Sequence, residues 1–311
     1  MTNILIIGAN GFIGSNLTRG LIKEDNEIST ISKIDSDEWR LQDLKKSYKK
    51  YSADIINYKK LHDGIFSLEP DVIINCATYG DYPVETDTEK IFQNNIIGTK
   101  NLMDVIEDYS KIKKIINVGS YLELLDFREK NGQKWEYYAS TKSKQTELTH
   151  EFGNKSGIPV STLRLFNPYG MYESPGRLVC DIMIALVKKQ ELEIFSKSTK
   201  HNFYHVDDVV DSIKKLIFDS STDDKIFNLK TMENISVESM VNIASQITDN
   251  HLEVVWKDED QREIQGRYKI KNTNDNVINP KISLKTGLSK TFSWFKENID
   301  LYKERGIRNE D

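Results

Sequence analysis

The sequence predicts an α/β fold, in which a doubly wound parallel sheet is followed by a smaller mixed α/β lobe. Three observations predict it. Short, nearly all-apolar strands alternate with helical segments through the first half of the 311-residue chain, which is typical of a parallel sheet covered on both faces. A glycine-rich turn joins the first strand directly to a helix. After about residue 166 the alternation loosens, so we expect a first domain over 1–166, a lobe over 167–303 and a polar tail over 304–311.

The elements of the first half follow in order from their hydrophobic patterns. Strands are predicted at Asn3–Ile7, Glu27–Ser32, a stretch ending at Asp54, Val72–Asn75, Lys114–Val118 and Val160–Leu165. Helices are predicted between them at about 12–24, 58–67, 86–109 and 137–156. Right-handed crossovers between parallel strands then require a doubly wound topology.

The second half contains enough elements for a smaller lobe, with some of the chain crossing back into the first domain. Helices are predicted near 178–189, 207–218, 237–248 and 289–303, and short strands near 192–195, 203–206, 226–229 and 252–256.

Composition and charge exclude several classes of protein. The chain carries 43 basic and 48 acidic residues without a basic block, so no nucleic-acid partner is expected. No apolar run is long enough to span a bilayer and the N-terminus has no leader, so we expect a cytoplasmic protein without a membrane partner. Cys76 and Cys180 lie far apart in apolar surroundings and are expected to be reduced. The five histidines form no metal motif, so no metal is expected.

The glycine-rich turn has the spacing G-x-x-G-x-x-G and predicts a bound dinucleotide. Gly8 permits a tight turn, Gly11 lets backbone N–H groups approach a pyrophosphate, and Gly14 lets the helix pack closely on the sheet. The helix N-terminus then offers unpaired donors and a positive dipole end to phosphates. The intervening Asn10, Phe12 and Ile13 are expected to share this cofactor site. A purely structural turn is the alternative.

The tip of the second strand indicates which dinucleotide is bound. Ser32 and Lys33 stand there, 18 and 19 residues beyond Gly14, and a hydroxyl with an ammonium suits a 2′-phosphate. NADP(H) is therefore favoured, although Asp35 keeps NAD(H) possible and Lys33 reads equally as a solvated lysine. After the third strand, Asp54 and Ile55 are expected to flank the adenine, unless Asp54 is only a helix-capping turn residue.

A reactive group is predicted from Tyr138, Lys142 and Ser120. Tyr138 and Lys142 are one helical turn apart and share a face. A cation one turn away favours the phenolate of a tyrosine, whose pKa is otherwise about 10, and makes it a general acid or base. Ser120 closes a buried strand at its carboxyl end, where such sheets bind ligands. The Tyr–Lys spacing alone occurs by chance in many helices. Asn95 lies mid-helix in the stretch before that strand, and taken alone it is interpreted as a helix-surface amide.

Together these motifs resemble the extended short-chain dehydrogenase/reductases, and more narrowly the NAD-dependent epimerase/dehydratase group that acts on nucleotide-sugars. The resemblance extends to about residue 300. It includes residues 163–170, similar to an R-x-x-N-x-Y-G stretch, and residues 203–208, similar to an R-D-F-x-x-V-x-D stretch.

The resemblance implies roles for individual residues. Ser120, Tyr138 and Lys142 would be catalytic, with Lys142 also contacting the nicotinamide ribose. Further cofactor contacts would come from Cys76, Ala77, Thr78, Asn95, Val118 and Leu165. Substrate contacts would come from Tyr79, Ser120, Tyr121, Asn167, Arg177 and Arg262, although either arginine alone reads as a surface residue. The resemblance also implies a nucleotide-sugar substrate and a homodimer formed through the helices near 86–109 and 137–156.

Departures from the family pattern reduce the number of reactions that we expect this chain to catalyse. His201 and Asn202 replace an Arg–Asp pair, which puts one phosphate contact in doubt. Tyr121 and Leu122 replace the Asp–Glu pair of the 4,6-dehydratases, so water elimination lacks a proton shuttle. We therefore expect an NADPH-dependent 4-ketoreductase of a nucleotide-4-keto-6-deoxyhexose in cell-surface sugar biosynthesis, since the turns at 77–80 and 120–121 resemble such 4-ketoreductases. An NAD-dependent 4-epimerase and a non-catalytic nicotinamide-binding regulator are the alternatives.

Overall fold

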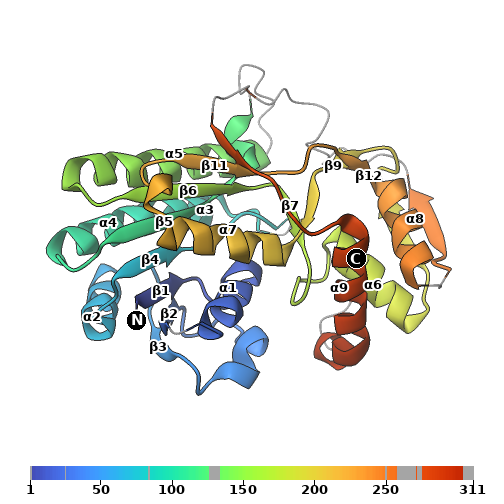
Figure 1. Ribbon diagram of the computed structural model, residues 1–311, viewed down its shortest axis with the longest axis horizontal. Helices are drawn as coiled ribbons and strands as arrows, with labels where there is room; N and C mark the ends of the chain where they lie inside the picture. Colours follow the sequence, from blue (N-terminus) through green and yellow to red (C-terminus); the bar gives the residue numbers. More distant parts are fainter. Residues whose placement is uncertain are drawn as a thin grey trace. The chain divides into compact units, whose positions relative to one another are not determined.

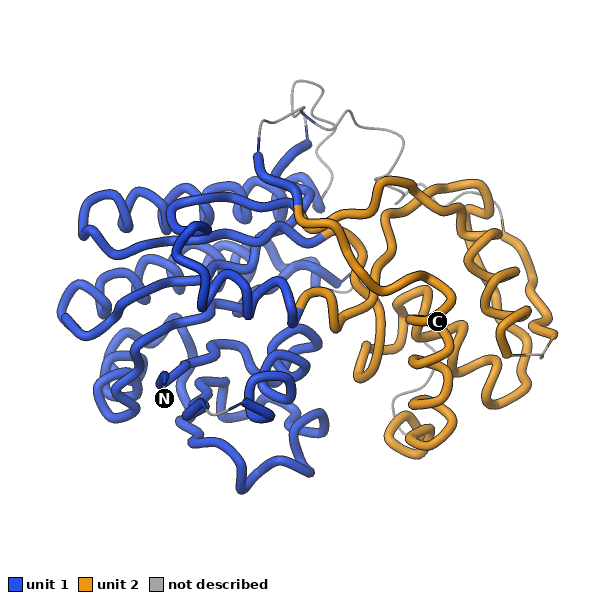
Figure 2. The backbone as a smooth tube through the Cα atoms, viewed as in Figure 1, with its two compact units in different colours: residues 1–165, 210–228, 270–277 blue, residues 166–209, 229–269, 278–311 orange. Residues whose placement is uncertain are grey.

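The structure is a computed structural model that describes residues 2–24, 26–82, 85–125, 134–248, 251–257, 271 and 275–303. The chain forms two compact units (Figure 2). Unit 1 contains residues 1–165, 210–228 and 270–277, and unit 2 contains residues 166–209, 229–269 and 278–311. The first passage between the units falls after Leu165, and the next falls inside helix α7 (Val206–Phe218).

Unit 1 holds most of the strands of one large sheet and the helices that cover it. Its strands are β1 (Asn3–Ile7), β2 (Glu27–Ser32), β3 (Lys49–Ser52), β4 (Val72–Asn75), β5 (Lys114–Ser120) and β6 (Val160–Leu165), with β11 (Ile226–Leu229) and β14 (Asn276–Ile278) at the far edge. Its helices are α1 (Phe12–Ile22), α2 (Tyr58–Leu68), α3 (Thr88–Phe92), α4 (Gly98–Asp108), α5 (Lys134–Ser156) and the second part of α7. Short helical turns are η1 (Trp39–Leu44), η2 (Gln93–Ile97), η3 (Tyr121–Leu124) and η4 (Ser220–Thr222).

The order of the strands confirms the predicted doubly wound sheet. The eight strands run β14-β11-β6-β5-β4-β1-β2-β3, and each pair of neighbouring strands from β3 to β6 is parallel. From β1 the chain builds outward to β2 and β3, then returns to β4 on the other side and builds outward to β5 and β6. The direction of winding therefore reverses between β1 and β4, and ligands of such sheets bind at this switch point, beyond the carboxyl ends of the strands.

Helices cover both faces of the sheet, which explains why its strands are apolar throughout (Figure 1). On one face, Leu61 of α2 and Leu102 of α4 pack into a buried cluster with Ile115 of β5. On the opposite face α1 meets α7, where a Cβ added at Gly20 would lie 2.4 Å from the Val210 side chain. This close approach requires a glycine, so helix–helix packing accounts for Gly20.

Unit 2 is a mixed α/β unit of short strands and helices, as predicted for the second lobe. It pairs β10 (Phe203–His205) with β7 (Asn167–Tyr169), β12 (Ile235–Ser236) with β9 (Lys200–His201), and β13 (Val254–Lys257) with β8 (Leu192–Phe195). Its helices are α6 (Leu178–Lys188), α8 (Val237–Thr248), α9 (Leu284–Asn298) and the short η5 (Ile299–Tyr302). The Asp208 carboxylate accepts hydrogen bonds from the backbone of Lys281 and Ile282, just before α9 begins.

Two predicted helices differ from the observed ones. The segment predicted as one helix over 86–109 contains a π-turn at η2, which hydrophobic periodicity does not reveal because the apolar stripe continues past it. The helix predicted near 289–303 begins earlier, at Leu284, because the Ser283 side chain accepts the backbone N–H of Thr286 as an N-cap. The short strands β7, β9, β12 and β14 were also not predicted.

Candidate active site

The glycine-rich turn lies at the switch point and its geometry requires glycine. Gly8 has φ +80°, and a Cβ there would lie 2.9 Å from the backbone nitrogen of Ala77. A Cβ at Gly14 would lie 2.4 Å from the Gly8 carbonyl oxygen. α1 begins after Gly11, which provides no side-chain cap, and its first turn contains no acidic residue. The N-terminal amides of α1 therefore have no side-chain anion against them within the described turn, which fits a phosphate ligand.

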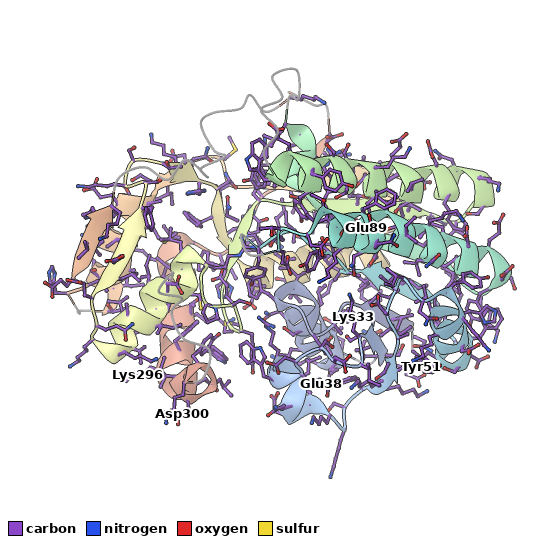
Figure 3. All side chains as sticks on the ribbon, turned by 180° about the vertical axis from the view of Figure 1, so that it is seen from behind. Lys33, Glu38, Tyr51, Glu89, Lys296 and Asp300 are labelled. Carbon is purple, nitrogen blue, oxygen red and sulfur yellow. The ribbon has the colours of Figure 1, made fainter. Side chains whose placement is uncertain are left out.

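The tip of β2 differs in detail from the predicted ribose site. The Ser32 hydroxyl is buried and has no hydrogen-bond partner among the described residues, while Lys33 is exposed and lies 3.3 Å from the Asp54 carboxylate. Figure 3 labels Lys33 together with Glu38, the residue before η1, and Tyr51 of β3. Lys33 is therefore the accessible group at this position.

Asp54 and Ile55 occupy the turn after β3. The Asp54 carboxylate accepts the backbone N–H of Ile56 at 3.2 Å, as a turn residue does, and also faces Lys33. Ile55 is buried, and a Cβ added at Gly98 would lie 2.6 Å from its side chain, so Ile55 packs against the start of α4. Both interpretations of Asp54, as a turn residue and as a neighbour of the adenine position, remain compatible with this geometry.

Arg40 was not predicted from the sequence as part of this site. Its guanidinium donates a hydrogen bond at 3.1 Å to the Asn10 carbonyl oxygen inside the glycine turn and stacks over Trp39. The Asn10 amide in turn donates to the Ser36 hydroxyl at 2.6 Å. Arg40 therefore braces the glycine turn from η1, a contact across 30 residues of chain that local patterns do not reveal.

Asn95 joins the loop after β4 to α5. Its side chain is fully buried, accepts the Tyr79 backbone N–H at 3.0 Å and donates to the Tyr79 carbonyl at 2.9 Å. It also donates to the Thr141 hydroxyl at 3.1 Å, and its oxygen lies 3.4 Å from the Thr78 hydroxyl. The alternative of a helix-surface amide is therefore wrong.

Ser120 ends β5 and begins a tight turn. Its hydroxyl oxygen accepts the Leu122 backbone N–H at 3.3 Å, and its own backbone N–H donates to the Glu123 carboxylate at 2.7 Å. One of the two lone pairs of this oxygen accepts the Leu122 N–H, so the hydroxyl hydrogen remains available to donate a hydrogen bond to a ligand. Tyr121, the next residue, is buried, and Leu165 pairs with Ser120 in the register of β5 and β6.

Glu123 was also not singled out from the sequence. Its side chain is fully buried and its second oxygen lies 2.8 Å from the Arg164 guanidinium, which also contacts Asp275 at 2.6 Å. A Cβ added at Gly119 would lie 2.6 Å from the Glu123 carboxylate, so the tight approach requires glycine at that position. A buried ion pair thus holds the Ser120 turn.

α5 carries Tyr138 and Lys142, and both are buried. The Lys142 ammonium donates to the Val118 carbonyl at 2.9 Å and to the Gln145 side-chain oxygen. Burial lowers the pKa of Lys142, and this effect is opposed by the negative charges of Glu123 and Asp81. A buried lysine whose ammonium is fixed by two acceptors is suited to orient a ligand and to stabilise negative charge beside it.

The Tyr138 ring lies against the loop after β4. A Cβ added at Gly80 would lie 3.0 Å from the Tyr138 ring, so Gly80 provides the space for it. The structure therefore brings Tyr79, Asn95, Tyr138 and Lys142 together in unit 1, near Val118 at the end of β5. These groups can hold an oxygen atom, move its proton and stabilise its charge.

The two cysteines and the candidate metal ligands show no reactive arrangement among the described residues. Burial raises the pKa of the Cys76 thiol to about 12, so this cysteine remains a protonated neighbour and not a nucleophile. Cys76 and Cys180 are both free, as expected. The described part of the chain contains no group of three or more histidine, cysteine or acidic side chains that could hold a metal ion.

The predicted substrate residues of unit 2 are described only in part. Asn167 lies on β7 and its backbone N–H donates to the Asn202 carbonyl at 3.3 Å. Arg177 is the residue immediately before α6. Arg262 lies outside the described residues.

Comparisons with known proteins show what this chain is similar to. A model of the NAD dependent epimerase/dehydratase family matches residues 4–229. A UDP-glucuronate 4-epimerase of Thermodesulfobacterium geofontis is 24% identical and aligns over 96% of this chain and 98% of its own length. A CDP-abequose synthase of Yersinia pseudotuberculosis is 26% identical over 89% of this chain and 91% of its own. The UDP-glucose 4-epimerase of Thermotoga maritima, solved with UDP-glucose, has the same fold, with TM-score 0.81, 22% identity and coverage of 96% and 99%.

None of the helices in the described residues is long and apolar enough to cross a membrane.

Proposed function

Because the chain belongs to the NAD dependent epimerase/dehydratase family, we propose that it is an NADPH-dependent 4-ketoreductase of a nucleotide-4-keto-6-deoxyhexose. The buried Lys142 ammonium carries this proposal, since it is fixed one helical turn from Tyr138 at the carboxyl end of β5. Such a site reduces a carbonyl to a hydroxyl or oxidises a hydroxyl to a carbonyl. We assign the sugar C4 oxygen as the atom that it binds.

The residues at the switch point fit a dinucleotide. Neither Gly8 nor Gly14 has room for a Cβ, and the tight turn that they form brings the backbone to the start of α1, where it can approach a pyrophosphate closely. Ala77 and Thr78 follow β4, Leu165 ends β6, and these residues would line the path toward the nicotinamide. When bound, the nicotinamide supplies or accepts a hydride.

Ser120, Tyr138 and Lys142 would share the proton chemistry. The Ser120 hydroxyl donates a hydrogen bond to the sugar C4 oxygen, because its contact with the Leu122 N–H uses a lone pair and leaves the hydroxyl hydrogen available. Tyr138 gives its proton to that oxygen as negative charge develops there. The Lys142 ammonium favours the resulting phenolate and uses its remaining N–H for the nicotinamide ribose. The protein therefore contributes orientation and electrostatic stabilisation.

The cofactor preference that we propose is for NADP(H). The tip of β2 presents Ser32 and Lys33 where an acidic side chain would bind the ribose hydroxyls of NAD. Lys33 is exposed, and a 2′-phosphate would compete with the Asp54 carboxylate for its ammonium. Ser32 is buried, so in this arrangement the charge of Lys33 supports the preference more than the Ser32 hydroxyl does.

A 4-epimerase is the second candidate function. It is favoured by the UDP-glucuronate 4-epimerase of T. geofontis, which aligns over nearly the whole of both chains. A 4,6-dehydratase is disfavoured because Tyr121 and Leu122 stand where that reaction needs an acid pair, and both are buried. A purely regulatory protein would not need Ser120, Tyr138 and Lys142 together.

The test incubates the purified protein with NADPH and a panel of nucleotide-4-keto-6-deoxysugars. Substrate-dependent loss of reduced-nicotinamide absorbance supports the reductase. Sugar interconversion without net cofactor consumption identifies the epimerase and refutes the reductase. Tyr138→Phe should abolish turnover while NADPH still binds, and Tyr137→Phe is the matched control because Tyr137 is the exposed neighbour on the same helix.

For this function we propose that Asn167, Arg177 and Arg262 contact the nucleotide-sugar. The homodimer and the cytoplasmic location stay predictions.

A further inference from the structure

Gln145 is a buried amide next to the reactive group that neither the sequence motifs nor the proposed mechanism uses. Its side chain is 1% exposed, and its oxygen accepts a hydrogen bond from the Lys142 ammonium. Of the three N–H donors of Lys142, the second goes to the Val118 carbonyl at 2.9 Å. No third acceptor for this ammonium occurs among the described residues, so one donor faces the site.

A directional chain of hydrogen bonds fixes the Gln145 amide. Its nitrogen donates to the Thr99 hydroxyl at 2.9 Å, and that hydroxyl donates to the Asn95 carbonyl at 2.8 Å. Because each hydrogen bond uses a donor of one residue and an acceptor of the next, the amide cannot rotate by 180° without placing its N–H groups against the ammonium. The oxygen is therefore held toward Lys142 by the π-turn that contains Asn95.

The charged groups around Lys142 explain why this oxygen matters. Burial disfavours its ammonium form, and the acidic groups that act on it, Glu123 and Asp81, are not hydrogen-bonded to it within the described residues. Cys76, the residue after β4, stays a thiol, and Tyr138 is the acid or base that the lysine serves. A neutral acceptor stabilises the cation without placing a negative charge near Tyr138, which would disfavour the phenolate.

We propose that Gln145 is a positioning residue, which holds the Lys142 ammonium in place as a cation and directs its free N–H into the reactive site. This inference rests on the proposed function, in which Lys142 serves Tyr138 and the nicotinamide ribose. Gln145 acts through Lys142 and contacts neither substrate nor cofactor.

The test compares Gln145→Leu with Gln145→Glu by NMR titration of protein labelled with ¹³C at lysine Cε. The Lys142 resonance is assigned as the one that is missing from the spectrum of Lys142→Met. Loss of the acceptor in Gln145→Leu should lower the Lys142 pKa, and the carboxylate in Gln145→Glu should raise it. Gln145→Leu should also lower kcat about tenfold, the effect of losing one charge-assisted hydrogen bond, with NADPH still bound. Thr149→Val is the matched control, because that hydroxyl is buried on the same helix and donates to the Gln145 backbone carbonyl.

Opposite shifts of the Lys142 titration, with none in Thr149→Val, support the proposal. An unchanged Lys142 titration in both Gln145 variants overturns it, whichever sugar the enzyme accepts. A loss of folding stability without a titration shift also overturns it, because this is what a purely structural glutamine would produce. The titration needs no substrate, so it tests the Gln145–Lys142 contact separately from the proposed function. If the Lys142 titration shifts but no sugar of the panel is turned over, the proposed function is refuted and the contact is not.

Discussion

Replacing the buried Glu123 by glutamine should destabilise the fold far more than replacing an exposed glutamate. The Glu123 carboxylate bridges the Ser120 backbone N–H at 2.7 Å and the Arg164 guanidinium at 2.8 Å, and its side chain is 0% exposed. In Glu123→Gln the amide oxygen can still accept the Ser120 N–H, but the amide nitrogen would face a guanidinium donor. Breaking one side of a buried ion pair costs about 3–5 kcal/mol in unfolding free energy. Since Arg164 keeps Asp275 at 2.6 Å, we expect about 3 kcal/mol, the lower end of that range.

The assay is urea denaturation followed by circular dichroism, with kcat measured on the same samples. Glu107→Gln is the control, because Glu107 forms an exposed ion pair with Lys155 at 3.3 Å and should lose about 0–1 kcal/mol. Glu123→Gln should keep most of kcat because the Ser120 turn keeps its acceptor, whereas Glu123→Leu should lose both stability and kcat. If Glu123→Gln is no less stable than Glu107→Gln, the ion pair does not hold the turn and the reasoning is wrong.

Three further predictions concern the cofactor turn, the ribose site and unit 2. Gly14→Ala should weaken NADPH binding, measured by nicotinamide fluorescence, much more than Gly11→Ala, because the added Cβ would lie 2.4 Å from the Gly8 carbonyl instead of 3.4 Å. Lys33→Glu should lower the ratio of kcat/KM for NADPH over NADH by about tenfold or more, through loss of a charge-assisted phosphate contact; an unchanged ratio would show that Lys33 does not read the 2′-phosphate. Burial raises the pKa of Glu173 to about 8 from an ordinary 4.5, so the folded state holds this proton more tightly and the associated stability is lost as pH rises from about 4.5 to about 8. Glu173→Gln should therefore raise Tm more at pH 8 than at pH 5, and an equal change at both pH values would contradict the buried, protonated carboxyl.

The local features of this protein could be predicted from its sequence. The apolar strands β1, β4 and β5 follow from strand and helix periodicity, and the doubly wound topology follows from the handedness of crossovers. The glycine turn was predicted because the positive φ of Gly8 and the approach of Gly14 to the Gly8 carbonyl arise within the turn itself, whereas the close approach of Gly8 to Ala77 does not follow from the local sequence. Tyr138 and Lys142 share a face because they are one turn apart in one helix.

The partners of these residues were decided only by the tertiary structure. Asn95 bonds to Tyr79, 16 residues away, and to Thr141, 46 residues away, and Arg40 reaches the glycine turn across 30 residues. Which side chains meet at such distances depends on which strands become neighbours in the sheet, and no local pattern records it. For the same reason the sequence predicted a reactive lysine but not the acceptors of its ammonium. Val118 is brought to Lys142 by packing of β5 against α5, and the Gln145 amide is oriented by Thr99 on α4.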